Sequence, residues 1–188
     1  MKTITTVMLA LMLFTLLGCG NQDKSSEQSS ESQTNVSAPK VDLHTAVVLN
    51  DLEAIRKHIE IGSDIDVFEP TRASTPLITA AALGKTEAAK ILIDAGADLN
   101  YQNNDGSTSL HTAAFFCSAG IVKALIEKGV NKTLKNSTGM TALEIVELPY
   151  EDHKAAYDVI GAGLKSAGFK IDHDHLKTTR PQIAEMLK

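Results

Sequence analysis

Residues 75–81 read TPLITAA and residues 108–114 read TSLHTAA, so one short motif occurs twice, 33 residues apart. A third copy begins at residues 141–143 (TAL), again 33 residues further along the chain. The sequence between the copies is repeated too, because residues 92–100 (LIDAGADLN) are matched by residues 125–133 (LIEKGVNKT). A fixed period of this length indicates a repeat protein in which similar units stack side by side.

The motif and its surroundings resemble the ankyrin repeat, in which each unit consists of a turn and two antiparallel helices. Residues 43–46 (LHTA) and 62–66 (GSDID) supply an earlier copy, so the resemblance covers four units at residues 41–168. It predicts an all-α solenoid of four ankyrin-type helix-turn-helix repeats with short β-hairpin-like fingers. We expect residues 169–188 to form a helical cap on the open end of the stack, with a short last helix that begins near Pro181.

The position of each residue in the repeat predicts which side chains form the core. Leu77 and Leu110 occupy the same motif position, and both should be deeply buried. The second helices should bury Ala88, Ile91, Leu92, Ile121, Val122 and Leu125, which follow helical spacing. His44 and His111 occupy the signature histidine position, and the resemblance implies that they form hydrogen bonds between turns.

The fourth unit departs from the pattern. Pro149 and Tyr150 replace the usual turn between the two helices, and the second helix expected at residues 152–167 contains Gly161 and Gly163. Each glycine in a helix costs up to about 1 kcal/mol relative to alanine. These glycines indicate either a close approach of two backbones or a break in the helix.

Residues 1–18 have the features of an export signal, with an apolar run at residues 7–17. That run is shorter than the roughly 20 apolar residues that span a bilayer. Residues 16–19 (LLGC) resemble the bacterial lipobox, which implies cleavage before Cys19 and acylation of that cysteine. The alternatives are an ordinary cleaved signal and an uncleaved anchor. Residues 19–40 are polar and aperiodic, which predicts a disordered tether.

These features predict a protein of the bacterial cell envelope, attached to a membrane through acylated Cys19 and facing the periplasm or the cell exterior. In the lipoprotein family, aspartate after the cysteine favours retention in the inner membrane. Gly20 stands there instead, which favours the outer membrane if the bacterium is Gram-negative.

In the ankyrin family, partner proteins are held by the finger tips and by the exposed end of each first helix. The two residues before the turn are mostly polar in the family, but here all eight are apolar: Val48, Leu49, Ala82, Leu83, Phe115, Phe116, Leu148 and Pro149. We expect an apolar ridge that binds a partner, flanked by the finger residues Phe68, Gln102, Asn104, Asp105 and Lys135. The alternative is that one residue of each pair packs inside the molecule, or that the tether or the C-terminal tail covers the ridge.

Two features indicate other chemistry. Cys117 stands where the repeat expects glycine, and its thiol would be either a redox-active group or a buried packing residue. Residues 172–175 (DHDH), together with His153, are able to supply metal ligands if they lie in an extended stretch, although the spacing is a weak signal. A metal or redox protein that uses His173, His175 and Cys117 is therefore an alternative hypothesis.

Composition and motifs narrow the function further. The net charge is −5 and the basic residues do not cluster, which argues against a nucleic-acid partner. The sequence has no phosphate-binding glycine loop, nucleophile elbow, HExxH or CxxC motif, so we expect neither an enzyme nor a cofactor. The predicted function is a membrane-anchored module, a scaffold or adaptor, that binds another protein of the cell envelope. The alternative within this class is an inhibitor or immunity protein for a secreted enzyme.

Overall fold

The computed structural model describes residues 38–165 and 170–188. Within that part of the chain it contains nine α-helices and no strand: α1 Leu43–Leu49, α2 Leu52–Glu60, α3 Pro76–Ala82, α4 Thr86–Asp94, α5 Ser109–Phe115, α6 Ala119–Glu127, α7 Ala142–Glu147, α8 Tyr150–Leu164 and α9 His173–Leu187. None of these helices is long and apolar enough to cross a membrane. The predicted signal, Cys19 and most of the predicted tether lie outside the described residues.

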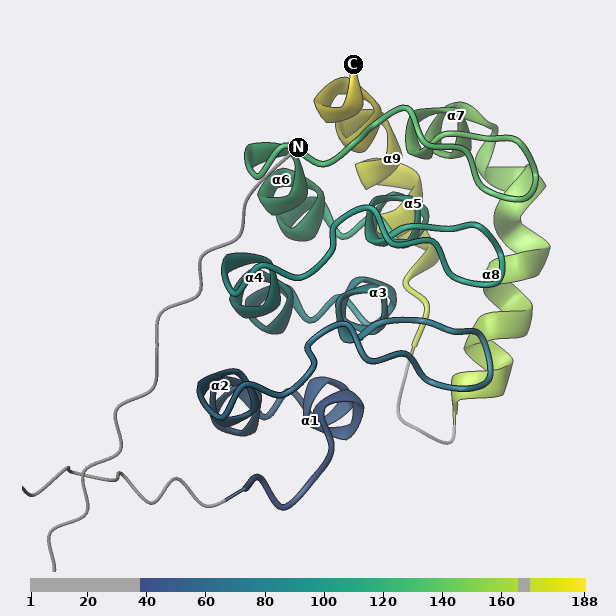
Figure 1. Cartoon of the computed structure of the whole chain (residues 1–188). Coiled ribbons are helices and arrows are strands. Elements are labelled where there is room, and N and C mark those ends of the chain that lie inside the picture. Colours follow the sequence, from purple (N-terminus) through teal and green to yellow (C-terminus); the bar gives the residue numbers. More distant parts are fainter. Residues whose placement is uncertain (1–37, 166–169) are drawn as a thin grey trace, which may run out of the picture. The chain divides into compact units, whose positions relative to one another are not determined.

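The helices stack in two columns, as the repeat period predicts. Figure 1 shows the first helices α1, α3, α5 and α7 in one column, with the second helices α2, α4 and α6 beside them. Each first helix packs against the first helix of the next unit, and each second helix packs against its own first helix and the next second helix. This arrangement confirms the all-α solenoid. The fingers that join the units consist of turns, so the expected hairpin character does not extend to a β-ladder.

One left-handed residue reverses the chain between the two helices of each of the first three units. Asn50, Gly84 and Cys117 have φ values of 56°, 64° and 54° and follow α1, α3 and α5 respectively. A residue in this conformation ends a helix and turns the chain back. The second helix therefore runs antiparallel to the first.

Aliphatic side chains fill the space between the columns. Leu77 and Leu110 are 0% and 1% exposed, as predicted. The second helices bury a triplet with the spacing i, i+1, i+4, which is Ala88, Ala89 and Leu92 in α4 and Ile121, Val122 and Leu125 in α6. Ile91 is only partly buried, contrary to the prediction, because Ala89 takes the inward position.

The fourth unit lacks the reversal. Leu148 and Pro149 are extended, with ψ values of 148° and 139°, and Tyr150 begins α8 directly. Figure 1 shows α8 running lengthwise beside the column of first helices, past the levels of α5 and α3, and not in the second column. The prediction that this helix is the second helix of the fourth unit is therefore wrong, and the physical reason is the missing left-handed residue. Gly161 marks a close approach, since a Cβ atom there would lie 3.1 Å from Ile171.

The helix α9 takes the vacant place in the second column. It packs against α7 and α6, as α6 packs against α5 and α4. Its buried residues Ile183, Ala184 and Leu187 repeat the i, i+1, i+4 spacing of the other second helices. The expected short helix near Pro181 begins earlier, at His173, because the Asp172 carboxylate accepts the His175 N–H (2.9 Å) and caps an additional N-terminal segment.

The motif histidines connect the first helices to the fingers. His44 Nε2 donates to the Val67 carbonyl (2.9 Å), and His111 Nε2 donates to the Met140 carbonyl (3.1 Å). His111 Nδ1 accepts the Thr108 N–H (3.2 Å), so both ring nitrogens are paired while the ring is neutral. These contacts confirm the structural role that the resemblance implies.

Truncating the buried motif leucine should weaken the whole stack. We expect Leu110→Ala to lower the free energy of unfolding by about 2–5 kcal/mol, because it leaves a cavity between two units. Urea unfolding followed by circular dichroism measures this loss. The matched control is Leu49→Ala, whose side chain is 66% exposed and should cost much less. Equal losses for the two variants would contradict the assigned core.

The buried His111 ring should make the fold sensitive to mild acid. Burial lowers the pKa of His111 below 6.5, although its backbone hydrogen bonds oppose this shift. The unfolded chain takes up a proton near pH 6.5 and the folded chain does not, so stability decreases as pH falls through this range. Between pH 7.5 and pH 5.5, the melting temperature measured by thermal unfolding should fall less for His111→Asn than for the wild type. An equal fall in melting temperature for the two proteins would show that His111 does not contribute to this pH dependence.

Candidate protein-binding surface

The predicted ridge is most exposed at the first unit. Val48 and Leu49, at the end of α1, are 49% and 66% exposed, and Phe68 in the first finger is 58% exposed. Leu83, at the end of α3, is partly buried. Leu148 is exposed in the fourth unit, but it belongs to the extended segment before α8.

Hydrogen bonds bring together the segments of α1, α3 and the first finger that carry these residues. His44 contacts Thr79 Oγ1 on α3 (3.4 Å) and the backbone of Val67 in the finger. One helical turn further along, Val48 lies on the same face of α1 as His44, and Leu83 lies on the same face of α3 as Thr79. We refer to Val48, Leu49, Val67, Phe68 and Leu83 as the apolar patch.

The centre of the ridge is covered by α8. The Tyr157 side chain is fully buried, and its ring lies 4.5 Å from the Phe115 ring between centroids. Its hydroxyl donates to the Phe115 carbonyl (2.6 Å), and the His153 ring packs edge-on against Phe115. Phe116 is also partly buried and meets Phe115 edge-on. The expectation of a continuous exposed ridge is therefore wrong at the third unit, where a C-terminal helix covers it.

A buried arginine holds α8 and α9 to the end of α7. Arg180 is 4% exposed, and its Nη2 donates to the carbonyls of Ile145 (2.7 Å) and Leu148 (2.8 Å). Its Nη1 donates to the Tyr157 hydroxyl (3.1 Å). A cation is favourable at a helix C-terminus, where unpaired carbonyls carry partial negative charge. Sequence reasoning missed Arg180, because nothing near it in the chain indicates a contact with α7.

Burial changes the pKa values of two side chains near Arg180, namely Tyr157 and Cys117. It raises the pKa of the Tyr157 phenol to about 12, although the Arg180 charge opposes the shift. It also raises the pKa of the Cys117 thiol to about 11, again against the Arg180 charge. Cys117 is 1% exposed and occupies the left-handed turn position, so the packing interpretation is confirmed. A buried, protonated thiol does not suit a redox role.

The residues named in the alternative metal hypothesis do not converge. His173 and His175 lie in the first turn of α9 and not in an extended stretch, so residues two apart point in different directions. His173 Nδ1 contacts the Tyr150 hydroxyl, and His153 Nε2 donates to the Ile145 carbonyl. No group of three potential ligands is found within residues 38–165 and 170–188. The geometry assumed for a metal site is wrong.

The predicted finger residues bind one another. The Arg72 guanidinium pairs with Asp105, and the Asn104 N–H donates to the Arg72 carbonyl (2.9 Å). The Gln102 amide donates to the Lys135 carbonyl (2.9 Å). These contacts join adjacent fingers, although the side chains remain on the surface. Their role in binding a partner stays a prediction.

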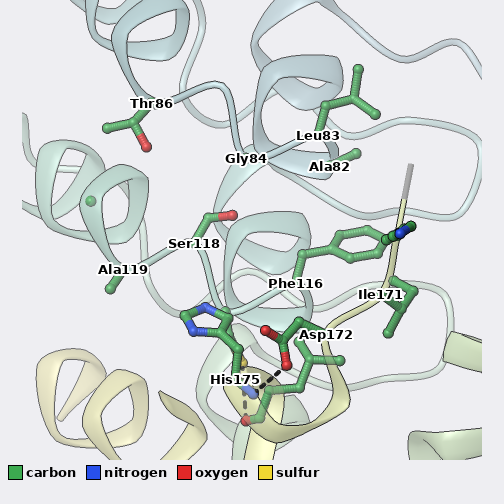
Figure 2. A pocket seen from close by; sticks show the side chains of 14 residues that line it. Ala82, Leu83, Gly84, Thr86, Phe116, Ser118, Ala119, Ile171, Asp172 and His175 are labelled. Atoms are coloured by element: carbon green, nitrogen blue, oxygen red, sulfur yellow. Dashed lines mark hydrogen bonds between the residues drawn. The ribbon is translucent and has the colours of Figure 1, made fainter. Parts of the chain in front are cut away.

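A hollow of about 430 Å³ lies beside the patch, between the turns that follow α3 and α5 and the segment before α9. Figure 2 shows Phe116 extending toward the segment that carries Ile171, with Leu83 on the neighbouring turn. No buried side-chain nitrogen or oxygen in the described residues lacks a hydrogen-bond partner. The hollow therefore offers mainly apolar contact area and no unsatisfied polar group that would select a small ligand.

Comparison with known proteins agrees with this geometry. A family model described as ankyrin repeats (3 copies) matches residues 43–144. Among solved structures, the chain is similar to the ankyrin repeat domain of Bcl-3, described as a unique member of the IkappaB protein family. The identity is 31%, the TM-score is 0.53, and the match covers 55% of this chain and 45% of that chain. The matched region thus spans less than half of that structure.

A search of curated proteins finds no match. The family model nevertheless covers more than half of the chain, and the helices it matches form the two stacked columns described above. Ankyrin repeats generally serve as non-enzymatic scaffolds for protein–protein interaction. This chain belongs to the ankyrin-repeat family.

Proposed function

We propose that the chain is a protein-binding module whose recognition surface is the apolar patch on its first two units. The observation that supports this proposal is the exposure of Leu49 (66%) and Phe68 (58%) in a fold whose other large apolar side chains are mostly buried. Contiguous apolar surface on a folded domain marks interaction sites. Large apolar anchors also contribute most of the binding energy of an interface.

Because α8 covers Phe115, the proposed recognition surface does not include the third unit. Because Tyr157 occupies the face of α5, the most exposed part of the patch is the end of α1 with the first finger. The exposed finger residues Gln102, Asn104, Asp105 and Lys135 would then form a polar border to the contact. An apolar centre with a polar border is the usual composition of a specific interface.

We also propose that Cys19 is acylated and holds the module at a membrane of the cell envelope, where its partner is another envelope protein. The support is the LLGC sequence at residues 16–19, preceded by the apolar run of an export signal. Several acyl chains on one cysteine anchor a protein firmly, whereas a single chain binds only weakly.

Charge introduced into the patch should abolish partner binding without unfolding the protein. We expect Leu49→Glu with Phe68→Glu to lose a partner that the wild type captures by photo-crosslinking on intact envelopes, because both side chains are exposed and a buried carboxylate is costly in an interface. Val159→Glu is the matched control, since Val159 is an exposed apolar residue (73%) on α8. Melting temperatures should stay close to that of the wild type. Capture of the same partner by the double variant would show that the patch is not the recognition surface.

Removing the proposed acylation site should release the protein from the membrane. We expect Cys19→Ser to abolish labelling by a clickable fatty acid and to move the protein out of the membrane fraction. Cys117→Ser serves as the control and should remain labelled, since Cys117 is buried in the third unit. Undiminished labelling of the Cys19→Ser protein would refute lipidation at this residue.

A further inference from the structure

We propose that Tyr150 is a nucleophile that accepts an acyl group from an activated ester, with His173 as its general base and Asp158 as the residue that positions His173. Tyr150 is the first residue of α8, Asp158 lies two turns further along the same helix, and His173 is the first residue of α9. None of the three belongs to the apolar patch, so this site is independent of partner binding.

The Tyr150 hydroxyl has a base within hydrogen-bond reach. It donates to His173 Nδ1, and the two rings meet edge-on with their centroids 6.2 Å apart. A phenol is mostly protonated at neutral pH, so it reacts as a nucleophile when a base removes its proton during the attack. A neutral imidazole serves as such a base through the ring nitrogen that carries no hydrogen.

Asp158 sets the tautomer and the orientation of this base. His173 Nε2 lies 3.4 Å from Asp158 Oδ1, so the hydrogen on Nε2 faces the carboxylate and Nδ1 is left to accept the Tyr150 hydroxyl. Asp158 Oδ2 accepts a hydrogen bond from Lys154 Nζ (2.7 Å), which lowers the pKa of Asp158. The carboxylate is therefore ionised at neutral pH and stabilises the imidazolium that forms when His173 takes the proton.

Lys177 supplies positive charge beside the phenol. Its Nζ lies 4.6 Å from the centroid of the Tyr150 ring. An opposite charge at this distance favours the ionised form of a group, so it favours the negative charge that develops on the Tyr150 oxygen. Tyr150 is only partly buried, which leaves the side chain accessible to a small acyl donor. A nucleophile, a base in contact with it and a third group that orients the base are the usual signature of an activated nucleophile.

The reaction is an acyl transfer that needs only the ester. The Tyr150 oxygen attacks the carbonyl carbon of the ester while its proton moves to His173 Nδ1. The bond between that carbon and the leaving oxygen then breaks, and His173 returns the proton to the departing oxygen. The products are an aryl ester on Tyr150 and one free alcohol, so atoms and charges balance.

The other two tyrosines are internal controls. Tyr101 is partly buried, like Tyr150, but its hydroxyl forms no hydrogen bond within residues 38–165 and 170–188. Tyr157 is fully buried, and burial raises its pKa to about 12. Reaction governed by exposure alone would label Tyr101 as readily as Tyr150, and Tyr157 should stay unlabelled in either case.

The test treats the full-length chain with p-nitrophenyl acetate and locates the acetyl groups by peptide mass spectrometry. We expect Tyr150 to be acetylated at least about tenfold faster than Tyr101, which is less than the factor of about 100 that a positioned base typically supplies, because this site is open to water. Tyr150→Phe should abolish this fast acetylation while it keeps the ring that stacks on Tyr157. Equal rates for Tyr150 and Tyr101, or no acetylation of Tyr150, would overturn the proposal.

The pH dependence separates a chemical role of His173 from a structural one. A phenol without a base reacts in proportion to its phenolate fraction, so its rate rises about tenfold per pH unit below about pH 10. The rate at Tyr150 should instead level off once the imidazole is neutral. His173→Gln should lower this rate about tenfold at pH 7.5 and restore the steep rise, and Asp158→Asn should lower it about threefold to tenfold.

A matched control tests whether Asp158 acts through His173 or only through its charge. The other charged side chains around His173 and Tyr150 are Lys154, Glu151, Lys177, Asp172 and Asp174. Asp174→Asn removes one exposed carboxylate next to His173 in the chain and should leave both the rate and the pH profile unchanged. Melting temperatures close to that of the wild type confirm that the variants fold. A wild-type pH profile in His173→Gln, or equal effects of Asp158→Asn and Asp174→Asn, would overturn the assigned roles.

Discussion

The whole arrangement depends on the reversal of the chain after each first helix. A left-handed residue at Asn50, Gly84 and Cys117 returns the chain antiparallel to the helix it has just left, so each unit closes on itself. Asn50 and Cys117, which unlike Gly84 carry a side chain, adopt this conformation at some cost, which the packing of the stack must outweigh. Where the fourth unit has Leu148 and Pro149 in extended conformation, the chain leaves the stack.

Loss of one turn explains several features that otherwise look unrelated. The helix α8 leaves the stack and covers α5, and α9 returns later to complete the second column. The carbonyls at the end of α7 receive hydrogen bonds from Arg180, which also contacts Tyr157. One cation thus connects three helices.

The sequence predicted the stack well because repeats are local. The 33-residue period, the buried Leu77 and Leu110 and the histidine contacts all follow from positions within a unit. The packing position of α8 could not be predicted in this way, because helical spacing identifies a helix but does not say where that helix packs. Exposure of the ridge depended on Tyr157, which lies 42 residues from Phe115 in the chain. The apolar triplet of α9 lies outside the 33-residue period, so the repeat pattern alone does not place this helix in the second column.

The detour through α8 has a consequence for how the molecule folds. The first three units pair helices that are neighbours in the chain, so each closes a short loop. The fourth must bring α7 and α9 together across residues 148–172, and a longer loop carries a larger entropic penalty. Contacts that are distant in sequence slow folding. During synthesis, the side of α6 that α9 covers therefore stays open until the last turns of α9 emerge, so for that period this unfinished end is the site most open to chaperones or to aggregation.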